Sequence, residues 1–252
     1  MRAVFRLAFW FVLILIALPI AVGAMTSYAK GWPQSWRAAD WTSTGTLADP
    51  SADPEAMIAV YAARSGRWKG IFADHHWIVI KPRGAASYTR YEVVGWGTPV
   101  RRNSRAPDGR WYGNVPVKVF LLRGPRAETL IPKVEAAVAS YPWTESGSYR
   151  VWPGPNSNTF VAHVLRQVTE LGAMMTPTGV GKDYLGPGVQ FARMPSGTGW
   201  QVSLWGILGA GVSRREGLEL HFLGSTIGIS PSQYAISLPA IGRLSLAPAV
   251  RG

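Results

Sequence analysis

The chain has 252 residues, of which 47% are hydrophobic and 16% are charged, and this composition excludes a mainly disordered protein. It contains no cysteine, which excludes a disulfide framework, a Cys-ligated zinc site, an iron–sulfur cluster and a cysteine nucleophile. Lys and Arg total 26 against 14 Asp and Glu, giving a net charge of +12. The basic residues form no recognisable nucleic-acid-binding motif, so we expect no nucleic-acid partner.

The N-terminal segment has the character of a membrane helix. Residues 7–24 are 18 residues without a charge, near the lower limit for crossing the hydrocarbon core, and Arg2 and Arg6 precede them. Arginines on this side predict a cytoplasmic N-terminus in the inner (cytoplasmic) membrane, with the main domain periplasmic or extracellular. A cleaved signal peptide has the same layout and stays an alternative. We favour a retained anchor over residues 1–30 that contacts membrane lipid.

Short strands and two helices are expected after a linker at residues 31–56. β-branched and aromatic residues predict strands at 57–64, 76–81, 88–97 and 117–122. Apolar stripes at helical spacing predict one helix from about Pro125 to residues 140–142 and a second from Asn158 to about Leu171. Further strands are expected at 201–208, 218–223 and 234–238.

This order of elements predicts an α+β fold with a mostly antiparallel sheet and few helices. We expect a single extracytoplasmic domain over residues 57–252. Its core is expected at 57–171, followed by a β-rich C-terminal extension at 172–252.

Two polar segments of this domain are candidates for one catalytic site. His76 opens an apolar strand, and Ser157 stands at the start of an amphipathic helix. A serine at a helix N-terminus gains from the positive end of the helix dipole, and a histidine can serve as its general base. Ser157, His76 and Glu92 therefore form a candidate triad in which Glu92 orients the imidazole. His75 points to the opposite face of the strand, and we expect it on the surface.

Each member of the candidate triad also has a structural explanation. Ser157 could be a helix cap, His76 could be a strand-end residue that hydrogen-bonds a loop, and Glu92 could form an ion pair with Arg90 or Arg83.

A second set of residues near these segments are candidates for binding a ligand. They are Asn156, Asn158, Trp152, Lys182 and Asp183.

We expect neither a metal nor a cofactor. The four histidines are scattered without HExxH-type spacing, and the chain has no Walker-type loop and no GxGxxG motif.

The densest basic run consists of Arg101, Arg102, Arg105 and Arg110. It could bind an anionic envelope component such as phosphate or lipid head groups, or simply be a solvated loop.

Two short motifs resemble the circularly permuted papain-like proteins of the NlpC type, which include the lecithin:retinol acyltransferase group. The segment His76–Ile80 is similar to their histidine-bearing strand. The segment Asn156–Phe160 resembles their Asn-Cys-Glu-His-Phe-type motif at a helix start, with Ser157 where the cysteine stands. The resemblance covers about residues 57–171 and implies a papain-like fold.

Longer motifs resemble an uncharacterised family of bacterial membrane proteins, the domain of unknown function 3750. The resemblance spans most of the chain, and the family has no established activity to carry over. Its motifs here are Arg90–Val93 with Gly95–Gly97, Trp152–Phe160 and Gly181–Tyr184.

Two functions of different classes follow as alternatives. The first, which the missing cysteine favours, is a membrane-anchored cell-envelope protein whose papain-like cleft binds a ligand or partner without turnover. The second is a serine-dependent hydrolase or acyltransferase acting on amide or ester bonds of an envelope substrate, such as a peptidoglycan peptide or a lipid. The second requires the imidazole of His76 within hydrogen-bond range of the hydroxyl of Ser157, with Glu92 or another polar group behind it and an open cleft beside them.

Overall fold

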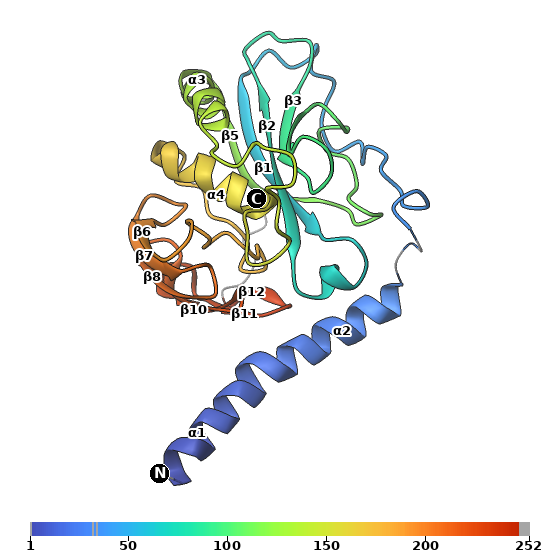
Figure 1. Cartoon of the computed structure of the whole chain (residues 1–252). Helices are drawn as coiled ribbons and strands as arrows, with labels where there is room; N and C mark the ends of the chain where they lie inside the picture. Colours follow the sequence, from blue (N-terminus) through green and yellow to red (C-terminus); the bar gives the residue numbers. More distant parts are fainter. Residues whose placement is uncertain (1, 32, 34, 247–252) are drawn as a thin grey trace.

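A computed structural model describes residues 2–31, 33 and 35–246 of the chain. Beyond an N-terminal helix, these residues form two antiparallel sheets and two longer helices (Figure 1). The predicted α+β class, with antiparallel sheets, few helices and an apolar N-terminal helix, is therefore confirmed. Short 3-10 turns lie at Arg67–Ile71, Thr169–Leu171 and Pro231–Gln233.

The N-terminal helix is continuous over 29 residues. It consists of α1 (Arg2–Val12), a π-helical turn (Leu13–Ala17) and α2 (Leu18–Lys30). Pro19 lacks a backbone N–H and its ring crowds the carbonyl four residues earlier, which the wider π-helical turn accommodates without ending the helix. The most apolar 18-residue stretch of this helix has a mean hydropathy of 2.6, so the helix is long and apolar enough to cross a membrane.

The first sheet has five strands in the order β4-β3-β2-β1-β5, and every neighbouring pair is antiparallel. β2 begins two residues earlier than the sequence predicts, so it includes Asp74 and His75. β1 and β2 are buried at almost every position, because both faces of the sheet are covered. The strands are β1 (Met57–Arg64), β2 (Asp74–Lys81), β3 (Thr89–Val93), β4 (Val100–Arg102) and β5 (Val117–Arg123).

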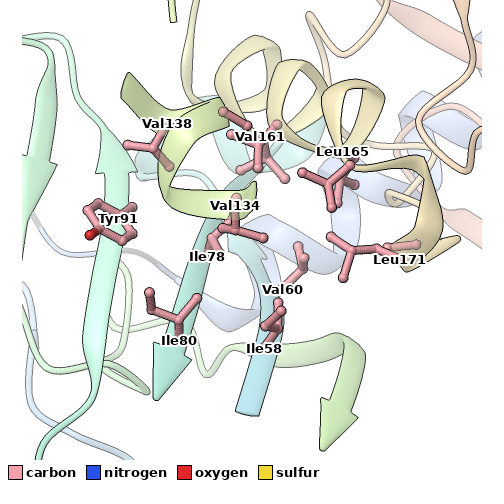
Figure 2. Packing of buried hydrophobic residues seen from close by; sticks show 14 of the residues in the cluster. Ile58, Val60, Ile78, Ile80, Tyr91, Val134, Val138, Val161, Leu165 and Leu171 are labelled. Carbon is pink, nitrogen blue, oxygen red and sulfur yellow. The ribbon is translucent and has the colours of Figure 1, made fainter. Parts of the chain in front are cut away.

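The two faces of this sheet carry separate apolar cores. One face packs against α3 (Pro125–Ala139) and α4 (Ser157–Gln167). The opposite face packs around Trp77 and Trp111, with Trp41 from the N-terminal segment against them. Figure 2 shows the core on the helix side, which includes Ile58, Val60, Ile78, Ile80, Val134 and Leu165.

The second sheet is a meander of seven strands in the order β12-β11-β10-β9-β8-β7-β6. The single strand predicted at 201–208 is wrong, because the chain turns back at Trp205 and Gly206, whose φ angles are 52° and 68°. No strand is predicted from the sequence at β4, β6, β10 or β12, and only the first residue of β8 falls within a predicted strand. The strands are β6 (Val189–Arg193), β7 (Gly199–Leu204), β8 (Leu208–Ser213), β9 (Gly217–Phe222), β10 (Ser225–Ser230), β11 (Ala235–Leu238) and β12 (Gly242–Ser245).

Candidate functional site

The N-terminus of α4 is capped by Asn156. The Oδ1 of Asn156 accepts hydrogen bonds from the backbone N–H groups of Asn158 (2.8 Å) and Thr159 (3.2 Å). The hydroxyl of Thr159 accepts one in return from the backbone N–H of Asn156 (3.1 Å), which completes a capping box. The cap is therefore not supplied by Ser157, which occupies the first position of the helix proper.

Ser157 lines a cavity of about 390 Å³ at the end of the five-stranded sheet. Within the described part of the chain, its hydroxyl and its backbone N–H have no hydrogen-bond partner. The cavity is of a size that suits a small ligand or the end of a longer chain. Its walls include the aromatic residues Trp96, Trp111, Tyr112 and Tyr149 and the polar residues Ser65, Lys69, His75 and Asn158.

The histidine in this cavity is His75, and its expected position on the surface is wrong because only 4% of the residue is exposed. Its Nε2 lies 3.0 Å from Oε2 of Glu92. Its ring stacks on Trp111, with the ring centroids 3.6 Å apart and the planes 6° from parallel. Glu92 also accepts hydrogen bonds from Nη2 of Arg90 (2.8 Å) and from the hydroxyl of Ser104 (2.8 Å).

Burial and the neighbouring carboxylate of Glu92 together determine the protonation state of His75. Burial lowers the pKa of His75, although the hydrogen bond and the charge of Glu92 oppose this shift. Burial alone raises the pKa of Glu92, but the hydrogen bond from His75 and the positive charge of Arg90 bring it down to about 2. At neutral pH an ionised Glu92 accepts a hydrogen bond donated by the Nε2–H of a neutral His75. The Nδ1 atom of His75 then carries the lone pair.

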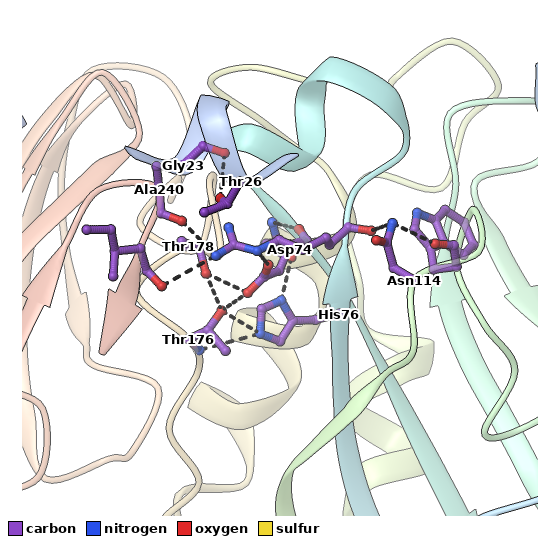
Figure 3. Close-up of polar contacts among 12 residues, drawn as sticks. Gly23, Thr26, Asp74, His76, Asn114, Thr176, Thr178 and Ala240 are labelled. Carbon is purple, nitrogen blue, oxygen red and sulfur yellow. Dashed lines mark hydrogen bonds and ion pairs between the residues drawn. The ribbon is translucent and has the colours of Figure 1, made fainter. Parts of the chain in front are cut away.

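His76 lies on the other face of β2, where it is fully buried beside α4. Its Nδ1 is 2.7 Å from Oδ1 of Asn158. The Nδ2 of Asn158 donates to the carbonyls of Asp74 (2.9 Å) and Val180 (2.8 Å), so Oδ1 is the acceptor and Nδ1 of His76 is the donor. The Nε2 of His76 faces the backbone N–H of Thr176 at 3.4 Å (Figure 3).

This environment keeps His76 neutral. Burial lowers its pKa to about 4, against the opposing charge of Asp74 and the hydrogen bond with Asn158. Asp74 itself accepts hydrogen bonds from the hydroxyls of Thr176 (2.7 Å) and Thr178 (2.5 Å). Figure 3 shows Asp74, His76, Thr176 and Thr178 close together beside the start of β2. His76 therefore holds the start of β2 to α4 and to the loop around Thr176.

The structure does not bring Glu92 to His76, and the strand register explains why. Ile78 pairs with Tyr91 across β2 and β3, so Trp77 stands opposite Glu92. Side chains alternate between faces along a strand, which places Glu92 on the side of Trp77 and His75. Of the three residues in the candidate triad, only Ser157 lines the cavity. Glu92 forms a hydrogen bond with His75, which lines the cavity too. His76 lies on the opposite face of the strand, where it contacts Asn158.

The other candidate binding residues divide between the cavity and the second sheet. Asn156 and Asn158 line the cavity. The Nε1 of Trp152 donates to the carbonyl of Leu223 (3.0 Å), and the indole is about half exposed outside the cavity lining. Lys182 forms a buried ion pair with Glu219, with Nζ 2.8 Å from Oε2.

Asp183 is buried next to Lys182 and is also absent from the cavity lining.

Three of the four arginines in the basic run contact other residues of the protein. Arg101 donates to the carbonyl of Trp96 (2.7 Å), Arg105 lies 3.6 Å above the ring of Trp41, and Arg110 pairs with Asp40 at 3.4 Å. In the described residues, no group of three or more His, Asp or Glu side chains could hold a metal ion.

Comparison with known proteins places this site within a family. The family model for proteins of unknown function, DUF3750, matches residues 55–184, which contain the five-stranded sheet, α3, α4 and the residues of the cavity. No curated protein and no solved structure matches the chain. The model covers more than half of the sequence, and the chain belongs to the DUF3750 family.

Proposed function

We propose that this protein is a membrane-anchored cell-envelope enzyme, a hydrolase or acyltransferase in which Ser157 attacks an amide or ester carbonyl. One observation carries the proposal. Ser157, with an unpartnered hydroxyl at the start of α4, lines the same cavity as His75, whose Nε2 is bonded to Glu92. This geometry reverses the preference for a binding module that the sequence alone suggests. It also replaces His76 with His75 as the general base.

A neutral His75 beside an ionised Glu92 can act as the base in the first step, the attack of Ser157 on the substrate. The Nδ1 of His75 takes the proton of the Ser157 hydroxyl as Oγ forms a bond to the substrate carbonyl carbon. The resulting imidazolium is stabilised by the ionised Glu92. His75 then returns the proton to the leaving amine or alcohol as the C–N or C–O bond breaks. Water in hydrolysis, or an acceptor hydroxyl or amine in transfer, releases the acyl group from Ser157.

The start of α4 also offers a site for the oxyanion. The backbone N–H groups of Asn158 and Thr159 are taken by the cap, and that of Asn156 is taken by the hydroxyl of Thr159. The N–H of Ser157 alone among these remains unpartnered in the described residues. It lies at the positive end of the helix dipole, so it favours negative charge on an adjacent oxygen.

The cavity walls limit the class of substrate. Trp96, Tyr112 and Tyr149 offer apolar and aromatic surface for an acyl chain, a sugar ring or a peptide side chain. Lys69, a partly exposed residue of the lining, can pair with a carboxylate. A peptidoglycan peptide, which carries free carboxylates, meets both conditions, and a lipid ester meets the first.

A fluorophosphonate probe tests this proposal. We expect the probe to label the wild type and to spare Ser157→Ala. Ser65→Ala is the matched control, because Ser65 lines the same cavity and has no role in the chemistry. Replacement of His75 by Ala should abolish labelling. Labelling of the wild type and Ser157→Ala to the same extent would refute Ser157 as the nucleophile.

Ligand binding without turnover is the second candidate function. It is favoured by one observation, since no hydrogen bond joins Ser157 to His75 in the described structure. In this case the probe labels no variant. A peptidoglycan peptide or lipid should still raise the thermal unfolding midpoint of the wild type and of Ser157→Ala equally. A bulky replacement of a cavity residue, such as Ser65→Trp, should remove that shift.

A further inference from the structure

The seven-stranded sheet has its polar side turned inward and its apolar side turned outward. The buried side carries Gln201, Ser203, Glu219, His221 and Thr226. The outward side, here named the apolar face, is 45–75% exposed at each of its main residues. These are Val189, Phe191, Trp200, Leu208, Val212, Leu218, Leu220, Phe222 and Ile229.

The strand register joins these side chains into one continuous surface. A single row runs across the sheet from Trp200 through Val212, Leu218 and Ile229 to Ile236. Phe191 and Leu220 belong to the next row, and Phe222 to the row after that. Contiguous exposed apolar surface of this extent is rare on soluble monomers and marks a face that contacts a partner or a membrane.

The charges around the apolar face have one sign. Residues 185–246 contain four basic residues and two acidic ones, and both acidic residues, Glu216 and Glu219, are buried. Arg214 and Arg215 lie in the turn between β8 and β9, beside the pair Val212 and Leu218 in the middle of that row. They line a hollow of about 520 Å³ together with Thr198, Ser232 and Gln233. The Nη1 of Arg215 donates to the carbonyl of Gly172, and the remaining guanidinium N–H groups, with the hydroxyl and amide groups of this hollow, suit a phosphate.

The apolar N-terminal helix packs against an edge of the same sheet. Gly23 of α2 is buried against Ala240, in the turn between β11 and β12, where a Cβ on Gly23 would lie 2.7 Å from the Cβ of Ala240. Nη2 of Arg64 donates to the carbonyl of Ala240 (2.6 Å), which ties this turn to β1. Figures 1 and 3 show α2 beside this part of the sheet. A bilayer crossed by the helix would therefore begin next to the sheet.

We propose that the apolar face lies in the interfacial layer of the membrane that the N-terminal helix crosses, with Arg214 and Arg215 binding the phosphates of anionic lipids. This rests on the helix acting as an anchor and is independent of the chemistry at Ser157. Burial of the exposed aromatic and aliphatic side chains among acyl chains supplies the binding free energy. The arginines add electrostatic attraction to anionic head groups. The second sheet of the domain then contacts the bilayer surface directly, in addition to the attachment through the N-terminal helix.

Spin labelling of the full-length chain tests this arrangement. The sequence has no cysteine, so a single cysteine can be introduced without removing another. Phe191→Cys, Leu218→Cys and Phe222→Cys place a nitroxide on the apolar face. Leu121→Cys is the matched control, because Leu121 is a similarly exposed apolar residue on β5 of the other sheet. Each variant is reconstituted into vesicles of phosphatidylglycerol and phosphatidylethanolamine, and flotation confirms that the anchor is inserted.

The readout is the collision of each label with oxygen, which concentrates in lipid, and with a water-soluble nickel chelate. We expect the oxygen-to-nickel ratio to be several-fold higher at the three positions on the apolar face than at Leu121. A ratio equal to that at Leu121 would mean that the face is in water and would overturn the proposal. Protection from both reagents, with dipolar broadening between labels, would identify a second copy of the chain and overturn it equally.

Discussion

The imidazole Nε2 of His75 and the carboxylate of Glu92 are 3.0 Å apart in the buried layer above Trp77. This contact gives two consecutive histidines different roles. His75 has an ionised partner on Nε2 and lines the cavity. His76, on the opposite face, uses Nδ1 to bond Asn158 and Nε2 to face Thr176. Of these two histidines, His75 is the one that lines the cavity.

Ser157 and Asn156 should differ sharply in their effect on stability. Ser157→Ala removes a hydroxyl without a partner in the described structure, so we expect the free energy of unfolding to change by less than about 0.5 kcal/mol. Asn156→Ala removes the helix cap and two hydrogen bonds to the carbonyls of Val151 and Val180, so we expect a loss of about 2–3 kcal/mol. Denaturant unfolding in detergent measures both values. An equal loss in the two variants would show that Ser157 is structural.

Glu92 should be far more important for stability than its neighbour Ser104. Glu92→Gln leaves the guanidinium of Arg90 buried without a counter-charge, above the ring of Trp77 at 4.1 Å. We expect a loss of about 3–5 kcal/mol in the free energy of unfolding. Ser104→Ala removes one hydrogen bond to Glu92 and should cost about 1 kcal/mol. The same unfolding measurement checks both, and a Glu92→Gln variant as stable as Ser104→Ala would contradict the ion-pair argument.

Much of the five-stranded sheet could be predicted because its residues give strong local signals. Met57–Arg64 and Val117–Arg123 are runs of β-branched and apolar residues, and the stripe in Pro125–Ala139 has helical spacing. The face of Glu92 could not be predicted in the same way. Both faces of β2 and β3 are buried, so neither strand shows the polar and apolar alternation that tells one face from the other.

The second sheet was harder to predict for a different reason. Its strands do alternate, but β8 and β10 contain glycines and short polar residues that also occur in turns. A strand such as β9, with Leu218, Leu220 and Phe222 on one side, predicts that this side is buried. The structure places it outside, and only the arrangement of the whole sheet shows this inversion.

The stability of the protein should fall as the pH is lowered through the range in which unfolded histidines become protonated. Burial depresses the pKa of His76 from about 6.5 to about 4, so between these values the unfolded chain binds a proton that the folded chain excludes. The stabilisation is complete above pH 6.5 and is lost as the pH falls toward 4. From this group alone we expect the free energy of unfolding to be about 2 kcal/mol lower at pH 5 than at pH 7.

The variant His76→Gln isolates this contribution, because glutamine does not titrate in this range. Its free energy of unfolding is already reduced at pH 7, but the further loss between pH 7 and pH 5 should be smaller than in the wild type by about 2 kcal/mol. His75, whose pKa burial also lowers, keeps contributing in the variant and leaves a residual slope of the same sign. Denaturant unfolding at the two pH values, in the same detergent, gives the four free energies required. If His76→Gln loses as much stability on acidification as the wild type, His76 is not the neutral, buried group that joins β2 to α4.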